Sequence, residues 1–480
     1  MNDSPSNKLI KNTSYYTIAL VVQKIISFTY FSYLASKIGS VGTAKYFFAV
    51  SFVTIFSVFI DLGLSSLINR EIAKDKESHQ KLLSNVIGVK LLSTLFIIAA
   101  IFLFSNILNY NQYLKNMIYL SMITMIIDSF TITFFAVIRG KHNLKYESIS
   151  AILFQLIVIT SGYFILQKTQ EPLLLLFVLL IASIFNFTYS SIILIKKYKI
   201  HIIPKFDKEF IKLLLITTWP FAIAGIFMRI SGSIDSVFLS KLATEKALGY
   251  YGLAYKITFA FQFIPLAFSA SLYPAFTHFF NYEKEKLENI FNKSIIYLLI
   301  IGFPISVGIL SIANPIILKI YGYDFYGAIL TLQILISSIP FLFITFPMGA
   351  LLNATNLQKK HTKNIGITMI VSIIFNFFLI RLYSQNGAAI ASIISTLTYL
   401  TLNTITCRKI INIHYKEIII NVIKILIACA IMALSIKYFE NKTNLLFIMV
   451  IGATTYALMA YTLKIFTKKD LSYIKSLKKT

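Results

Sequence analysis

The sequence predicts an all-α integral membrane protein of about fourteen transmembrane helices, and three observations lead to this fold class. Of the 480 residues, 57% are hydrophobic and only 13% are charged, whereas about 25% of residues are charged in soluble domains. Apolar runs long enough to cross roughly 30 Å of hydrocarbon recur along the whole chain. The loops between these runs alternate between rich and poor in Lys and Arg, as insertion topology requires.

Fourteen apolar runs lie between polar or charged breaks, and each is interpreted as a membrane-crossing helix. The first, at residues 14–36, is too long for the apolar region of a signal peptide, so we expect it to stay in the membrane. In chain order the others cover residues 43–64, 84–104, 116–138, 149–167, 172–195, 212–236, 247–277, 294–312, 325–352, 364–380, 386–406, 417–436 and 443–463.

The formal net charge of +26 reflects membrane topology rather than a nucleic-acid partner. If the N-terminus is cytoplasmic, and Lys45 and Lys212 at the span edges are counted with the adjoining loops, the inside segments hold 30 of the 45 Lys and Arg residues, the outside loops hold ten, and the spans hold five. Positive residues are retained on the cytoplasmic side during insertion. The threefold bias therefore predicts an even number of helices with both termini in the cytoplasm.

An internal repeat is visible at an offset of 204 residues. Ser36, Lys37 and Ile38 match Ser240, Lys241 and Leu242, in each case after the first helix of a six-helix block. Two blocks with an even number of spans share one orientation and should enclose a cavity between them. We therefore expect an N-terminal six-helix bundle over 1–210 and a second bundle over 211–410. The last two helices and a basic cytoplasmic tail should occupy 411–480.

Several short motifs, in their order and spacing, resemble the polysaccharide flippases of the Wzx type. These belong to the MOP exporter superfamily, which also holds the multidrug MATE transporters and the lipid II flippase MurJ. The resemblance covers essentially the whole chain. The stretches that carry it are Asp61 to Leu64, Asn69 to Glu71, Trp219-Pro220, Arg229 to Asp235, and Gly249 to Lys256.

The resemblance implies a MATE-like V-shaped pair of bundles that works by alternating access in the bacterial cytoplasmic (inner) membrane. Its implied substrate is an oligosaccharide on undecaprenyl pyrophosphate, for an O-antigen, capsule or exopolysaccharide. The implied partners are this lipid-linked oligosaccharide, the membrane lipids, and a polysaccharide polymerase with its chain-length regulator. No cofactor is implied.

Cations inside the spans are the candidates for binding the pyrophosphate. Lys24 lies about 15 Å into the first span at 1.5 Å per residue, where a charge is costly unless it faces a cavity or a partner. Arg229 is its approximate repeat equivalent, and its planar guanidinium can bind two phosphate oxygens. These two residues would give one cation per bundle. Lys256 and Lys90 are further candidates.

Each of these cations also has a purely structural explanation. Lys24 could pair with a carboxylate, Arg229 could be neutralised by Asp235, and Lys256 could extend to a membrane interface. Lys90 lies close to a cytoplasmic helix end, where the same extension is easy.

Three carboxylates within the spans, Asp61, Asp128 and Asp235, are candidates for coupling transport to H⁺ or Na⁺. Each would change its charge state between conformations, and each could equally be a structural partner of a nearby cation.

Missing motifs argue against an enzyme. The chain has no GxxxxGK followed by Ser or Thr, so it is not itself an ATP-driven pump. The polar stretches, about 65–83 and 196–211, are too short to fold a catalytic domain. Cys407 and Cys429 lack metal-ligand spacing, and we expect no metal site.

Two alternative functions remain open. A multidrug or organic-ion antiporter of the same fold would favour an acidic cavity, whereas Lys and Arg exceed acids inside these spans. A polytopic polysaccharide polymerase or ligase would be expected to carry a long outside loop, and none is long here.

Overall fold

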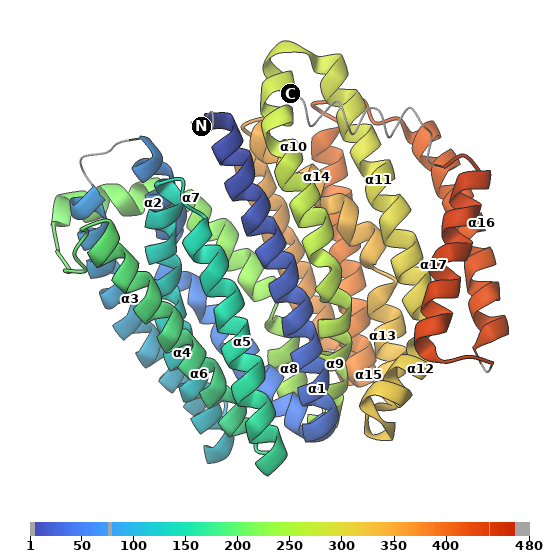
Figure 1. The fold of residues 1–480 in the computed structure, drawn as a ribbon, viewed down its shortest axis with the longest axis horizontal. Helices are drawn as coiled ribbons and strands as arrows, with labels where there is room; N and C mark the ends of the chain where they lie inside the picture. The colour runs from blue at the N-terminus through green and yellow to red at the C-terminus, as the bar shows by residue number, and fades with distance from the viewer. Residues whose placement is uncertain (1–4, 75–78, 441, 466–480) are drawn as a thin grey trace. The chain divides into compact units, whose positions relative to one another are not determined.

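In the computed structural model, residues 5–74, 79–440 and 442–465 are described, and no β-strand occurs among them. The structure is helical almost throughout (Figure 1). The first α-helices in the chain are α1 (Pro5–Asp61), α2 (Leu64–Lys74), α3 (His79–Ile107), α4 (Gln112–Gly140), α5 (Lys145–Lys168), α6 (Pro172–Ile192), α7 (Lys208–Ser231), α8 (Ile234–Leu242) and α9 (Glu245–Phe259). They continue with α10 (Phe263–Tyr282), α11 (Lys284–Ser311), α12 (Ala313–Ile316), α13 (Ala328–Ile336), α14 (Ile339–Ala354), α15 (Gln358–Cys407), α16 (Tyr415–Phe439) and α17 (Leu445–Thr462).

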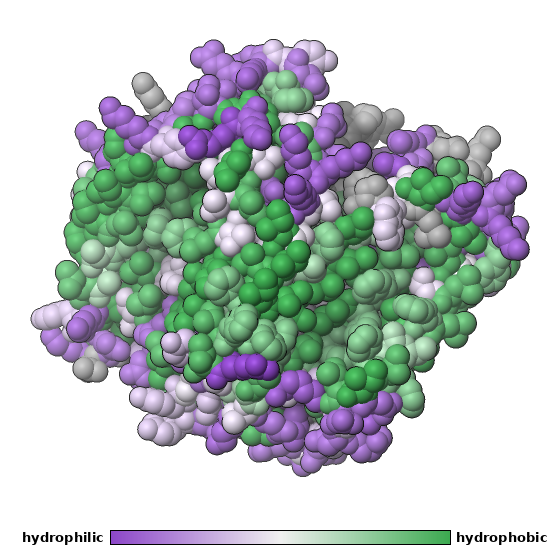
Figure 2. Space-filling view, turned by 180° about the vertical axis from the view of Figure 1, so that it is seen from behind, coloured by the Kyte–Doolittle hydropathy of each residue, from purple (hydrophilic) through white to green (hydrophobic). Residues whose placement is uncertain are grey.

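The multi-pass membrane fold is confirmed. Within the described ranges, 11 helices are long and apolar enough to cross a membrane, or 12 if the bent pair α13 and α14 forms one span. Figure 2 shows hydrophobic side chains gathered over the middle of the helices and hydrophilic ones toward both ends, on the face in view. This distribution matches a hydrocarbon layer between two aqueous phases.

Two of the helices are much longer than a bilayer is thick. The span within α1 has 41 residues and that of α15 has 50. Each contains a break, at Gly39 with a φ of 68° and at Ser384 with a φ of 52°. The predicted runs 14–36 and 43–64 lie on either side of the first break, and 364–380 and 386–406 on either side of the second. Each long helix therefore has room for two crossings, and the exact count of fourteen stays a prediction.

The chain divides into two compact units, which are described separately. Unit 1 ends at Leu253 and unit 2 begins at Ala254. Unit 1 therefore extends past the boundary predicted at residue 210 and contains α7 and α8, both of which pack against α1. At Gly225 of α7, a Cβ atom would lie 3.0 Å from Val58 of α1, so a side chain there would crowd this contact.

A hydrophobic core of unit 1 is formed where α2, α3 and α4 meet the π-helical segment Ile193–Lys197 that follows α6. Leu64, Ile68, Phe134 and Leu194 are fully buried in it. The helices α2 and α4 approach so closely that a Cβ on Gly140 would come within 2.8 Å of Ile72. This packing fixes the position of the end of α4. Several polar residues lie along one face of this helix.

Unit 2 has its core between α10, α11, α14 and α16. Its most buried side chains include Phe276, Phe291, Leu351 and Ile425. The last two helices, α16 and α17, pack against each other, and α16 packs on α11. Residues 466–480, where the basic tail was predicted, lie outside the described residues.

A hydrogen-bond motif recurs in the two units and supports the internal repeat. In unit 1, Asn85 Oδ1 accepts from the Asp207 N–H at 2.9 Å. In unit 2, Asn292 Oδ1 accepts from the His414 N–H, also at 2.9 Å. In each case the asparagine Nδ2 also donates to the carbonyl four residues earlier. Both partners shift by 207 residues. The chain just before α7 is thus bonded to α3 in unit 1, and the chain just before α16 is bonded to α11 in unit 2, in the same way.

Candidate functional site

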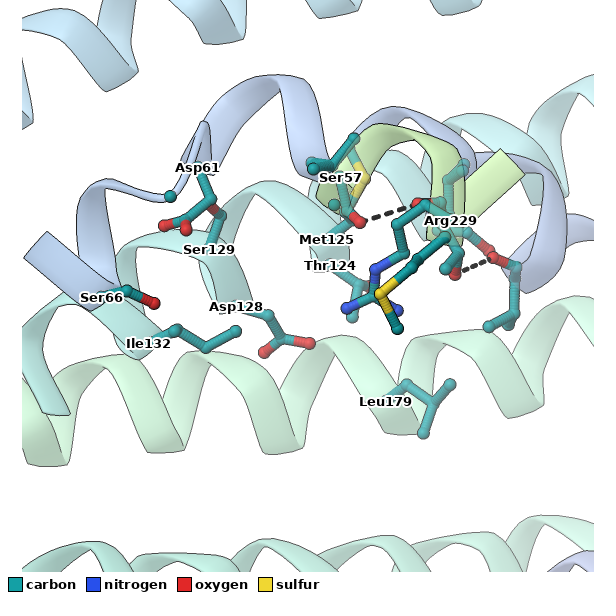
Figure 3. Close-up of a pocket in the computed structure, with 18 of the residues that line it drawn as sticks. Ser57, Asp61, Ser66, Thr124, Met125, Asp128, Ser129, Ile132, Leu179 and Arg229 are labelled. Atoms are coloured by element: carbon teal, nitrogen blue, oxygen red, sulfur yellow. Dashed lines mark hydrogen bonds between the residues drawn. The ribbon is translucent and has the colours of Figure 1, made fainter. Parts of the chain in front are cut away.

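Unit 1 contains a cavity of about 690 Å³ (Figure 3). It is lined by residues of α1, α2, α4, α5, α6 and α7, and its volume is within the range of about 300–1,000 Å³ typical of small-molecule sites. Three charged residues line it: Asp61, Asp128 and Arg229. Most of the remaining lining is apolar, with hydroxyls from Thr54, Ser57, Ser66, Ser121, Thr124 and Ser129.

Asp61 reaches the cavity because α1 ends at this residue. The next two residues have positive φ, 46° at Leu62 and 76° at Gly63, and α2 begins at Leu64. Positive φ is costly for a residue with a side chain such as leucine, whereas glycine adopts it readily. The motif from Asp61 to Leu64 therefore forms the sharp turn that places a carboxylate and the start of α2 at the cavity wall.

Lys90 on α3 is fully buried and forms an ion pair with Asp61. Its Nζ lies 2.8 Å from Asp61 Oδ1 and donates to the Ser129 carbonyl at 2.7 Å and the Ser129 hydroxyl at 3.0 Å. The Ser65 hydroxyl donates to the same Asp61 oxygen. A lysine ammonium has three N–H groups, and these contacts use all of them. Lys90 is therefore the ion-pair partner of Asp61 and does not extend to the membrane interface. Direct substrate binding by Lys90 stays a prediction.

Arg229 lies in the last turn of α7 and points into the cavity that Asp128 of α4 also faces (Figure 3). No salt bridge to Arg229 is found within the described part of the chain. Asp128 is half-buried near the middle of α4. The cavity thus presents a guanidinium and a carboxylate that are not paired with each other.

Asp235 does not neutralise Arg229 in this structure. It is buried in α8, where its Oδ1 accepts from the Ser236 N–H at 2.8 Å and its Oδ2 accepts from the Tyr251 hydroxyl. Its carboxylate therefore holds α8 to α9, and it does not line the cavity.

Neither of the other two predicted cations lines this cavity. Lys24 is exposed on α1 and does not line it, although the adjacent Gln23 lines a smaller cavity. Lys256 is exposed on α9 and belongs to unit 2. Lys24 and Arg229 both belong to unit 1, so the compact units do not carry one of these cations each. Roles for Lys24 and Lys256 in substrate binding stay predictions.

The hydroxyl lining was not anticipated from the sequence, although a signal for it exists. Ser121, Thr124, Asp128 and Thr131 follow one another at intervals of three or four residues along α4. Residues at this spacing share one helix face. Such a polar stripe in an otherwise apolar span predicts a surface facing a cavity or another helix.

The fold and the cavity define a multi-pass helical membrane protein with a charged chamber inside one of its units, the arrangement expected of a transporter. The chain belongs to the polysaccharide biosynthesis protein family, whose family model matches residues 9–280. A second model, MatE, matches residues 220–378. These matches confirm the resemblance to the MOP exporters.

Similar proteins agree with this assignment. The chain is 21% identical to the lipid II flippase MurJ of Bacillus subtilis, over 90% of this chain and 88% of that protein. It is also 21% identical to the capsular polysaccharide biosynthesis protein CapF of Staphylococcus aureus, over 81% of this chain and 96% of that protein.

Solved structures show the same fold. A lipid II flippase MurJ in an inward closed conformation aligns with a TM-score of 0.76 at 19% identity, over 93% of this chain and 97% of that one. An inward-facing multidrug MATE transporter of the MOP superfamily aligns with a TM-score of 0.66 at 17% identity, over 81% and 94%. The predicted exporter fold is thereby confirmed.

Proposed function

We propose that this protein is a flippase that moves a pyrophosphate-linked oligosaccharide on a polyprenyl lipid across the bacterial cytoplasmic membrane. Family membership and the relatives, a lipid II flippase and a capsule biosynthesis protein, support this proposal. One structural observation carries it: the guanidinium of Arg229 faces a cavity inside a membrane-spanning unit. The chain acts as a transporter rather than an enzyme. A polymerase and its chain-length regulator would use the product outside.

Arg229 suits the pyrophosphate because its planar fork can donate to two phosphate oxygens at once. An apolar wall lowers the local dielectric and strengthens this attraction. Asp61 is already compensated by Lys90, so the net field near Arg229 depends mainly on Arg229 and Asp128. The phosphate end of the substrate therefore binds at the α7 side of the cavity.

The membrane potential can drive such a substrate outward. Moving about two negative charges out of a cell with an inside-negative potential of 100 mV releases on the order of 4.6 kcal/mol, at about 2.3 kcal/mol per charge. Coupled movement of H⁺ or Na⁺ would add to this free energy or oppose it, depending on its direction. Asp128 is the best placed of the three candidate carboxylates for coupling, because Asp61 is held by Lys90 and Asp235 by Tyr251.

A multidrug antiporter is the second candidate. Two carboxylates line the cavity against one arginine, and the MatE model matches part of the chain. An organic cation would bind at Asp128 and away from Arg229. Removing the charge of Arg229 should therefore reduce transport if the protein is a flippase and increase export of an organic cation if it is an antiporter.

Flipping by purified protein in proteoliposomes tests the proposal. A fluorescent polyprenyl-pyrophosphate oligosaccharide is added, and its exposure to a membrane-impermeant quencher is followed. Arg229→Ala should reduce flipping at least tenfold, since charge-assisted hydrogen bonds contribute about 1.5–3 kcal/mol. Arg229→Lys should recover only part of it, because one ammonium cannot reproduce bidentate binding. Arg381→Ala, an exposed arginine that contacts Phe377, serves as the control.

Full flipping by Arg229→Ala would refute the assigned role of Arg229. Export of ethidium by the wild-type protein, increased by Arg229→Ala and without flipping of the lipid, would favour the antiporter. Lys24→Ala in the same assay tests whether the exposed lysine of α1 also contributes.

A further inference from the structure

A second cavity adjoins the first within unit 1. It has a volume of about 320 Å³ and shares Asp128, Ile132 and Phe154 with the larger cavity. Its other lining residues include Gln23 of α1, Glu147 of α5 and Asn186 of α6. Asp128 therefore stands at the junction between the two spaces, and a ligand could extend from one into the other past this residue.

Two of the polar groups in the second cavity are held by neighbours. The Ser150 hydroxyl donates to Asn186 Oδ1, which leaves the Asn186 amide nitrogen as the donor available to a ligand. Arg139 Nη1 donates to Glu147 Oε1 at 2.8 Å, and both side chains of this ion pair are mostly shielded. These contacts orient the groups before any ligand arrives, which lowers the entropy cost of binding.

The lining combines groups that suit a sugar ring. Gln23 and Asn186 offer amide donors and acceptors, and the carboxylates of Asp128 and Glu147 accept hydrogen bonds from hydroxyls. Phe135 and Phe154 add aromatic surface, on which the apolar face of a pyranose can pack. The volume is at the small end of the range for small-molecule sites, so it suits a small part of a glycan rather than a long one.

Charge sets the direction in which a substrate would lie. Asp128 repels a pyrophosphate but accepts hydrogen bonds from sugar hydroxyls, and Glu147, whose charge is balanced by Arg139, adds a further acceptor. Arg229 attracts the phosphates in the larger cavity. A pyrophosphate near Arg229 with its sugar directed past Asp128 satisfies both the attraction of the phosphates and the hydrogen bonding of the sugar. The reverse orientation would bring the phosphates against Asp128, in a cavity whose lining among the described residues contains no Lys or Arg.

We propose that the smaller cavity, lined by Gln23, Glu147 and Asn186, is a carbohydrate subsite that binds the sugar next to the pyrophosphate. This proposal rests on the proposed flippase function, because it takes its sugar from the same lipid-linked substrate. It assigns the selectivity for the sugar to unit 1, and to residues other than the four candidate cations.

Binding to the full-length protein in nanodiscs tests the subsite. The probes are a polyprenyl pyrophosphate without sugar and the same lipid bearing one hexose, one N-acetylhexosamine or one deoxyhexose. The wild-type protein should bind at least one sugar-bearing probe about tenfold or more tightly than the bare one. Gln23→Leu and Asn186→Ala should each reduce that preference several-fold to tenfold and leave binding of the bare pyrophosphate unchanged.

Gln167→Leu is the matched control, since Gln167 is an exposed glutamine on α5 outside both cavities. Two variants are used because Asn186 also accepts from Ser150 and its loss could disturb packing, whereas Gln23 has no hydrogen-bond partner within the described residues. The subsite is refuted if no sugar improves binding or if both variants keep the wild-type preference. In those cases binding of the bare pyrophosphate still supports the flippase. If the wild-type protein binds neither kind of probe, the proposed function itself fails and the subsite with it.

Discussion

Removing the charge of Asp61 should destabilise the protein more than removing the charge of its partner Lys90. Lys90 is completely buried, whereas the Asp61 side chain is 29% exposed at the cavity. In Asp61→Asn the ammonium keeps its contacts to Ser129 but loses its counter-charge and has no access to water. Breaking a buried ion pair in this way costs about 3–5 kcal/mol.

Lys90→Met leaves the opposite charge in a different environment. The carboxylate of Asp61 still accepts from Ser65 and can be hydrated from the cavity. We expect a cost of about 1–2 kcal/mol, the range for a partly satisfied polar group. The double variant Asp61→Asn with Lys90→Met contains neither charge and should be more stable than Asp61→Asn alone.

Thermal denaturation of the detergent-purified variants, followed by size-exclusion recovery, measures these differences. At about 2–4 °C per kcal/mol for a unit of this size, Asp61→Asn should lower the midpoint by roughly 6–20 °C. Lys90→Met should lower it by roughly 2–8 °C. The reasoning is refuted if Lys90→Met is the more damaging change, or if the effects of the two single variants simply add in the double variant.

Two further predictions concern topology and pH. Accessibility reporters at Lys205 and Lys360 should read cytoplasmic and one at Ala243 external, as the charge bias requires. A cytoplasmic reading at Ala243 together with Lys205 would contradict the helix count. A reporter at Lys76 should also read cytoplasmic, although this residue lies outside the described residues. Asp207 caps α7 by accepting from the Phe210 N–H and pairs with Lys81, and these contacts lower the pKa of its carboxyl. Its stabilising effect is therefore complete above the ordinary pKa of 3.8 and is lost as the pH falls toward the lowered value. Asp207→Asn keeps the cap acceptor but has no charge to lose, so its thermal denaturation midpoint should fall less on acidification than that of the wild type. An unchanged pH profile would exclude this role of the Asp207 carboxylate.

Much of the fold was predictable because a bilayer leaves the backbone few options. Every buried N–H and C=O must find a partner within the chain, so apolar runs of sufficient length become helices. The all-α multi-pass class and the exporter resemblance followed from such runs and from short motifs, and both are confirmed. The runs also located the breaks near Gly39 and Ser384, where the chain leaves the helical conformation.

The candidate site was only partly predictable. Their position within apolar spans identified Lys90, Asp128 and Arg229 as candidate residues, because membrane insertion penalises charges wherever they point. Depth along a span singled out Lys24, which is exposed on α1 and does not line the larger cavity. Depth does not give direction around the helix axis or the identity of a partner on another helix. The sequence therefore left open an extension of Lys90 to the interface and a pairing of Arg229 with Asp235, neither of which the structure contains.

Sequence alone determined that the protein spans the membrane many times, that its loops carry an asymmetric positive charge, and that a few costly charges lie within its helices. Only the tertiary structure decided how those charges are matched: Lys90 with Asp61 and Ser129, Asp235 with Tyr251, and Arg229 left facing the cavity with Asp128. The physical reason is that insertion cost depends on local composition, which the sequence contains. Pairing depends on the rotation and packing of helices that are distant in the chain, which only the folded structure fixes.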